Sequence, residues 1–310
     1  MNLAKSFSLF SLCFALAFAL GNPVRATEFE KLSTQKLLDA AEFEYKHKRC
    51  EKAMSLAEEL LRRDPASERA YWIKAGSLDY LVGPAEAIKF LEPAIKKYPR
   101  NFLLLVDIAE YYNSAGQFNK AIDVLTTAIK MQPSKYEYYH MRSIAYSSQK
   151  RYREAADDMT AYLKLHPAHA RGYQWRADAY KQLGQFDKAI ADLGQAIELG
   201  KKQAGEYRLQ RADLYMDLKE YKKALADYDV VLKESAMDDT VWFKKGQVLV
   251  LLKDYNNALK AFTEAIELSD SSTAYYARSD VYEKLKDHAA ALKDRAMGDK
   301  LAKQRAIERI

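Results

Sequence analysis

Side chains suited to catalysis or metal binding are sparse in this chain and scattered along it. The five histidines are His47, His140, His166, His169 and His288. His166 and His169 flank Pro167, and no other histidine or cysteine stands nearby in the sequence to complete a zinc site. We therefore expect these two histidines to lie in a solvated turn and to bind no metal. The chain also has no glycine-rich phosphate loop, no nucleophile elbow and no metalloprotease helix motif.

Arginine and aspartate, in contrast, recur at one fixed spacing. An aspartate follows an arginine by 16 residues in Arg142 and Asp158, Arg176 and Asp192, Arg211 and Asp227, and Arg278 and Asp294. Where Lys245 replaces the arginine, the partner position holds Ala261. Because the two positions mostly change together, we expect structural salt bridges between two helices. An arginine ladder for an anionic ligand is the alternative, but an arginine that already has a partner is a poor anion site.

Eight alanines give the spacing of the elements that carry these side chains. They are Ala53, Ala87, Ala121, Ala155, Ala189, Ala224, Ala258 and Ala291. Five of the seven intervals are 34 residues, and the other two are 35 and 33. A small residue at this period is typical of an array of helical hairpins, in which each repeat contacts only its neighbours. Glycine (11) and proline (7) are scarce, which also favours helices.

Further residue types repeat in register with these alanines. A second small residue stands twelve positions before each alanine, a bulky residue usually stands four before that, and Tyr or Leu usually three after it. Spacings of four and three place these side chains on one face of a helix. The second helix of the first four repeats is expected to end at Pro65, Pro99, Pro133 and Pro167. The turn inside each hairpin carries either glycine or lysine.

This series of bulky, small and aromatic residues resembles the tetratricopeptide repeat (TPR) over residues 34–303, in about eight repeats. The resemblance implies an all-α fold, a right-handed α-solenoid of helix-turn-helix repeats with a concave groove lined by the first helix of each repeat. It also implies a protein or peptide ligand in that groove. Because packing positions account for every repeat, we expect no enzyme activity and no cofactor. Residues 27–33 then form a short linker, and residues 304–310 a helical tail.

The resemblance places the ligand-binding side chains on the first helices, off their packing faces. The candidate groove residues include Trp72, Tyr80, Glu110, His140, Asp178, Asp213, Asp217, Phe243, Tyr276 and Asp280. From the fifth repeat onward their carboxylates outnumber the cations, which favours a ligand with Lys or Arg and an apolar anchor for Trp72 or Phe243. The alternative is that these acids only keep the surface soluble.

Some TPR domains hold a peptide carboxyl terminus with a lysine and asparagine clamp, and this chain departs from that pattern. The positions that require lysine carry Leu38, Trp72, Val106 and His140. The positions that require asparagine carry Glu42, Gly76, Glu110 and Ile144. Binding of a chaperone tail is therefore disfavoured.

The first 26 residues differ in composition from the rest of the chain. Lys5 precedes an apolar run from Ser6 to Leu20, which Gly21 and Pro23 then interrupt. This pattern is typical of a secretory signal, with cleavage after Ala26. A retained anchor is the alternative, although the run is short for a membrane span. We expect export to a periplasmic or extracellular location, with no stable membrane span after cleavage.

The mature chain is expected to carry little net charge and one thiol. Without Lys5 and Arg25, 47 of the 49 basic residues remain against 43 acidic ones, a net charge of +4. This excess is too small to indicate nucleic acid as a partner. Cys50 would be the one remaining cysteine, so no internal disulfide is expected. It stands where later repeats carry an aromatic residue, which predicts a buried thiol.

These patterns favour an exported, non-enzymatic TPR scaffold that binds a partner protein or peptide. The alternative is an envelope assembly or regulatory subunit that binds a glycan, a lipoprotein or a cell-wall or secretion enzyme. Aromatic side chains such as Trp72 and Tyr80 could then stack on sugars. The sequence specifies no oligomeric state.

Overall fold

The computed structural model describes residue 29 and residues 32–307. The predicted signal sequence, residues 1–26, lies outside the described residues. Within the described part, sixteen α-helices and one short 3₁₀ helix follow one another without any strand. The predicted all-α solenoid of helical hairpins is therefore confirmed. None of the described helices has both the length and the apolar character that a membrane crossing requires.

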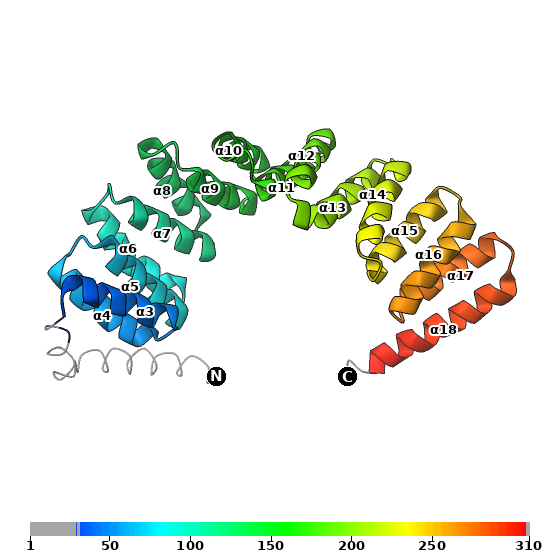
Figure 1. The fold of residues 1–310 in the computed structure, drawn as a ribbon, viewed down its shortest axis with the longest axis horizontal. Helices are drawn as coiled ribbons and strands as arrows, with labels where there is room; N and C mark the ends of the chain where they lie inside the picture. The colour runs from blue at the N-terminus through cyan, green and yellow to red at the C-terminus, as the bar shows by residue number, and fades with distance from the viewer. Residues whose placement is uncertain (1–28, 30–31, 308–310) are drawn as a thin grey trace, which may run out of the picture. The chain divides into compact units, whose positions relative to one another are not determined.

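The helices fall into two compact units, residues 1–149 and residues 150–310. In each unit, consecutive helices pack as antiparallel neighbours (Figure 1). We call the first helix of a hairpin the A helix and the second the B helix. The first unit contains α3 (Thr34–Lys46), α4 (Cys50–Arg63), α5 (Glu68–Leu81), α6 (Pro84–Lys97), α7 (Phe102–Ser114), α8 (Phe118–Met131) and α9 (Tyr136–Ser148).

The second unit continues the same alternation of helices. Its A helices are α11 (Ala170–Gln182), α13 (Ala204–Asp217), α15 (Asp239–Leu251) and α17 (Ser272–Lys284). Its B helices are α10 (Tyr152–Leu165), α12 (Phe186–Leu199), α14 (Tyr221–Glu234), α16 (Tyr255–Leu268) and α18 (His288–Ile307). The 3₁₀ helix η1 (Lys201–Gln203) precedes α13. Helix α18 continues past residue 303 without a break, so residues 304–307 extend the last helix of the array.

The eight regularly spaced alanines lie where the helices of a hairpin cross. Each of them is at most 1% exposed. The second small position has the same role, since a Cβ atom at Gly246 would lie 2.5 Å from the Phe262 ring. Another small residue, Gly298 of α18, acts likewise, because a Cβ atom there would lie 2.7 Å from the Tyr276 ring. Helices approach this closely only where one of the facing side chains is small. The period of about 34 residues therefore follows from close helix packing.

The turn inside each hairpin contains one residue with a left-handed backbone. Glycine occupies this position in three hairpins, at Gly83, Gly116 and Gly184. Lysine occupies it in the other five, at Lys48, Lys150, Lys219, Lys253 and Lys286, with φ from 58° to 65°. This explains why glycine recurs at this position of the sequence, where lysine stands in the other hairpins. The left-handed conformation costs a residue with a Cβ atom about 1–2 kcal/mol, and glycine escapes that cost.

The four predicted helix-ending prolines stand two residues beyond the ends of α4, α6, α8 and α10. A proline cannot donate the next helical hydrogen bond, so the chain turns there. The following A helix then ties the turn down in two cases, because Tyr71 donates its hydroxyl to the Pro65 carbonyl (3.2 Å) and Tyr139 to the Pro133 carbonyl (3.0 Å). The bulky position of the A helix thus also stabilises the connection between repeats.

Candidate ligand-binding surface

The A helices of successive repeats lie side by side within each unit. In the first unit α3 contacts α5, α5 contacts α7 and α7 contacts α9, and in the second unit α15 contacts α17. The faces of these helices that do not pack on B helices form a strip in each unit, and we call these faces the A-helix surface. The candidate groove residues belong to it.

Five of the candidate groove residues are exposed and available to a ligand. They are Tyr80, which is 57% exposed, and the acids Glu110, Asp178, Asp217 and Asp280. None of these four carboxylates makes a hydrogen bond or ion pair with another residue of the described chain. The Tyr80 ring has Lys48 over it, with the ammonium 5.6 Å from the ring centre. This group remains a prediction for ligand binding.

Four other candidates, Trp72, Phe243, Tyr276 and His140, are half-buried. The Arg69 guanidinium lies 4.9 Å from the centre of the Trp72 ring, and the Tyr45 ring meets Trp72 edge-on at 4.8 Å. The Phe243 ring packs against Phe262 at 5.6 Å. Neither Trp72 nor Phe243 is therefore an open platform for an apolar anchor, because each ring already packs on a neighbouring side chain.

The Tyr276 hydroxyl donates to Asp299 Oδ1 (2.8 Å). His140 is half-buried on α9.

Asp213 differs from its expected role as a carboxylate for the ligand. Lys244 of the next A helix donates to both of its oxygens (2.8 and 2.9 Å), and the Tyr228 hydroxyl donates to Oδ1 (3.1 Å). The carboxylate is half-buried and links α13 to α15 and α14. This contact was missed because Lys244 stands 31 residues away, a spacing that the pattern did not include.

Three of the Arg and Asp pairs form bidentate ion pairs between the A and B helices of one repeat. Arg176 donates from Nε to Asp192 Oδ2 (2.8 Å) and from Nη2 to Oδ1 (2.7 Å). The same two bonds, at 2.7–2.9 Å, join Arg211 to Asp227 and Arg278 to Asp294. The aspartates are only 5% exposed. Each Asp carboxylate raises the pKa of its arginine, and the guanidinium has little capacity left for a ligand.

Arg142 and Asp158 belong to different units, so their pairing stays a prediction. Within the first unit, Arg142 Nη1 donates to Thr126 Oγ1 (2.8 Å).

This bond represents a second link that the sequence analysis missed. We call the arginines and lysines that stand just before the second small residue of each repeat the Arg column. These cations also contact the B helix of the preceding repeat, through a residue 16 or 15 positions earlier in the sequence. Besides the Arg142 bond, these links join Arg176 to Thr160 (3.2 Å), Arg278 to Thr263 (2.8 Å), Lys245 to Asp229 (2.7 Å) and Lys74 to Glu58 (2.8 Å). A hydroxyl or acid 16 residues before the cation was the available signal. The links connect neighbouring repeats and explain why Lys245 needs no acid at position 261.

His166 and His169 flank a turn, as expected, but the expectation that their side chains are solvated is wrong. Both rings are half-buried and stacked at 5.1 Å, with 18° between their planes. The Tyr162 hydroxyl lies 2.9 Å from His169 Nδ1 and 3.3 Å from His166 Nδ1, and Trp175 packs on His169 at 5.5 Å. Burial, together with the nearby charges of His166 and Arg171, lowers the pKa of His169. The histidines therefore belong to an aromatic cluster that joins α10 to α11.

The predicted burial of Cys50 is confirmed, because its side chain is 3% exposed at the start of α4. Burial raises the pKa of the thiol, which favours the unreactive protonated form.

A carboxylate in the first unit was overlooked. Asp107 of α7 is 9% exposed, and its Oδ2 has no hydrogen-bond partner in the described part of the chain. Burial raises the pKa of Asp107 to about 7, with further contributions from Glu110 and Glu68. The available signal was an aspartate at a position where three other repeats carry the large side chains Ile73, Met141 and Trp175, although the first repeat carries Asp39 there.

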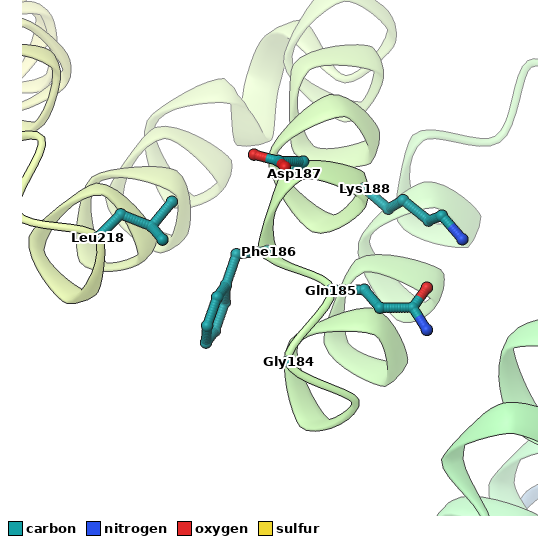
Figure 2. Close-up of a pocket in the computed structure, with 6 residues that line it drawn as sticks. All are labelled: Gly184, Gln185, Phe186, Asp187, Lys188 and Leu218. Carbon is teal, nitrogen blue, oxygen red and sulfur yellow. The ribbon is translucent and has the colours of Figure 1, made fainter.

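A hollow of about 360 Å³ lies elsewhere, at the hairpin turns of the second unit. It is lined by Gly184, Gln185, Phe186, Asp187, Lys188 and Leu218 (Figure 2). Figure 2 shows the Lys188 and Gln185 side chains pointing away from Leu218. None of the candidate groove residues takes part in it, and its two charges have opposite sign. Among the described residues, no group of three His, Cys, Asp or Glu side chains could hold a metal ion.

Comparison with known families agrees with this architecture. One family model, tetratricopeptide repeat, matches residues 106–170, 140–204 and 175–240, and a second model of the same repeat matches residues 239–271. These matches together span more than half of the chain. The chain is a tetratricopeptide repeat protein. Neither model belongs to an enzyme family, and no curated protein matches the chain.

Solved structures resemble this TPR protein in fold. A tetratricopeptide repeat protein from Parabacteroides merdae is 19% identical, with a TM-score of 0.53, over 84% of this chain and 98% of that one. The Naa15/Naa10 structure bound to HypK-THB is 17% identical, with a TM-score of 0.52, over 81% of this chain and 39% of that one. A MamA protein gives 19% identity and a TM-score of 0.49 over 55% of this chain and 93% of that one. At these identities the first two show the TPR fold alone, and the third supports no argument.

Proposed function

We propose that this TPR protein is an exported, non-enzymatic scaffold that binds a partner protein or peptide on its A-helix surface. The observation that carries the proposal is the set of exposed carboxylates on that surface that have no hydrogen-bond or ion-pair partner among the described residues. Glu110, Asp178, Asp217 and Asp280 make no internal ion pair among the described residues. Arg176, Arg211 and Arg278, in contrast, already form ion pairs between helices.

Protein or peptide is preferred to glycan as the ligand class. A sugar needs an open aromatic face on which to stack. The Trp72 ring already has the Arg69 guanidinium at 4.9 Å and the Tyr45 ring at 4.8 Å, and the exposed Tyr80 ring already has the Lys48 ammonium over it at 5.6 Å. Unpaired carboxylates on several A helices suit the lysine and arginine side chains of a polypeptide better.

Export is proposed from the amino-terminal pattern of Lys5, the apolar run and Ala26. Secretion of the full-length chain by its source cells would produce a mature protein that begins at Thr27. Mass spectrometry of the amino terminus checks this, and recovery of an intact Met1 terminus on the exported protein would contradict cleavage.

Charge reversal on the A-helix surface tests the binding proposal. Residues 27–310 are immobilised, and partners are captured from the exported proteins of the source organism. We expect the double variant Asp217→Lys and Asp280→Lys to lose the main partners, because the reversed charges repel a cationic ligand. The matched control, Glu198→Lys and Glu264→Lys, reverses two exposed acids on the B helices α12 and α16. Equal capture by both double variants and the wild type would contradict the proposal.

A further inference from the structure

We infer that the A-helix surface of the first unit contains a binding site for a lysine or arginine side chain of the partner, centred on Asp107. The inference rests on the proposed function and names the chemistry by which the partner is recognised. It differs from the sequence-based expectation, which placed the acidic part of the surface in the fifth and later repeats.

The first argument is that Asp107 lacks a partner. Its Oδ2 is fully covered and accepts no hydrogen bond from the described residues, while the side chain as a whole keeps 9% of its surface exposed. A buried carboxylate without a partner lowers the stability of the folded protein. Positions that lower stability in this way are expected where the group serves function.

The second argument is that the nearest cation is already engaged. The charged groups that act on Asp107 are Glu110 on α7 and Glu68 and Arg69 on α5. Arg69 donates from Nε and Nη2 to Glu42 on α3, and its guanidinium also stacks on Trp72. The negative charge around Asp107 therefore exceeds the positive charge that the protein supplies.

The third argument is that the surroundings need donors and offer aromatic rings. The rings that interact with Asp107 are Tyr45 of α3 and Tyr111 of α7. Burial, with the nearby carboxylates, raises the pKa of both Tyr45 and Tyr111, so these rings stay neutral. Ammonium and guanidinium groups bring donors and no acceptors, and they bind favourably to aromatic faces.

An organic cation fits this site better than a metal ion. Calcium and magnesium require several oxygen ligands gathered at one point, and the described residues contain no such group of three. A side-chain cation needs fewer contacts. The exposed Glu110 carboxylate offers the cation its first contact. The side chains that cover Asp107 Oδ2 have to move aside before the cation can reach that oxygen.

Two peptides and two variants test the site. The probe is a fluorescent, acetylated and amidated peptide of alternating leucine and arginine. Its counterpart replaces arginine by citrulline, which keeps the size and hydrogen-bonding groups but removes the charge. Binding to residues 27–310 is measured by fluorescence anisotropy at about pH 8, where the Asp107 carboxylate is ionised.

We expect the arginine peptide to bind, and Asp107→Asn to weaken it at least about tenfold. We expect the citrulline peptide to bind the wild type no more tightly than it binds Asp107→Asn. Asp123→Asn removes an exposed acid on the B helix α8 and leaves the affinity unchanged. Asp107→Asn also removes an unpaired buried charge, so it unfolds at an equal or higher temperature, which separates loss of the site from loss of the fold. If Asp107→Asn does not fold, Glu110→Gln replaces it, with an expected loss of about threefold or more.

The inference is overturned if the wild type does not bind the arginine peptide, if the citrulline peptide binds equally well, or if Asp107→Asn (or its replacement, Glu110→Gln) binds the arginine peptide like the wild type. Capture of natural partners separates this result from the proposed function. If the wild type still captures partners that Asp217→Lys and Asp280→Lys lose, the scaffold function stands and only the Asp107 site is rejected.

Discussion

At the scale of single residues, buried charges in this protein have two contrasting environments. Asp192 accepts two hydrogen bonds from Arg176, which itself lies close to the rings of Tyr173 and Tyr180. Asp107 has a covered oxygen with no donor among the described residues. The first arrangement stabilises the array. The second leaves a carboxylate oxygen that a cation of a partner protein can bind.

The Arg176 and Asp192 pair is expected to show strong coupling. Its side chains are 19% and 8% exposed, so removing one partner leaves the other buried without compensation. Arg176→Met or Asp192→Asn alone lowers the free energy of unfolding by about 3 kcal/mol, and the double variant loses less than the sum. Urea denaturation of the four proteins measures the coupling. The exposed pair of Lys89 and Glu86 is the control, with no resolvable coupling. Strict additivity at Arg176 and Asp192 would refute a cooperative pair.

His169 predicts a loss of stability in weak acid. Its folded pKa is lowered from an ordinary value of 6.5, so the unfolded chain binds the proton more tightly. The stabilising effect is present above 6.5 and is lost as the pH falls through the folded pKa. Between about pH 7.5 and about pH 5.5, the wild type therefore loses more stability than His169→Gln. Thermal unfolding at both pH values checks this, and parallel losses in the two proteins would rule out His169 as the cause.

At the scale of helices and turns, close packing explains what the sequence predicted and what it did not. The small residues and the prolines mark each hairpin because they act within one repeat. The link from Lys244 to Asp213 and the backward bonds of the Arg column join different repeats, so a pattern counted within one repeat omits them. The aromatic cluster was missed for the same reason, since Tyr162 and the two histidines are joined across a turn.

Two glycines of the same hairpin are expected to respond oppositely to alanine. Gly184 has a φ of +69°, so Gly184→Ala lowers the free energy of unfolding by about 1 kcal/mol even though nothing lies within 4 Å of the added Cβ. Gly194 lies inside α12, with Arg211 Nη1 3.8 Å from the added Cβ. Gly194→Ala therefore raises stability by about 0.5–1 kcal/mol. Chemical denaturation measures both, and a stabilised Gly184→Ala would contradict the left-handed turn.

At the scale of the whole molecule, each unit contributes acidic side chains to the A-helix surface. The first unit supplies Glu110 and Asp107, and the second supplies Asp178, Asp217 and Asp280. The periodic sequence predicted which helices carry this surface. It did not show which acids are free, because Asp213 is neutralised by a lysine of the next repeat and Asp107 becomes notable only once its burial is known.

The most direct measurement is site-specific photo-crosslinking of the protein in its source cells. A photoreactive amino acid is placed on the A helices, at Tyr80, Asp178 or Asp280, and on the B helices, at Lys89, Glu198 or Glu264. All six positions are exposed, so each can report a contact. We predict that a partner protein crosslinks at the A-helix positions and not at the B-helix positions. Crosslinks confined to the B helices, or no protein crosslinks at any position, would contradict a scaffold that binds its partner on the A-helix surface.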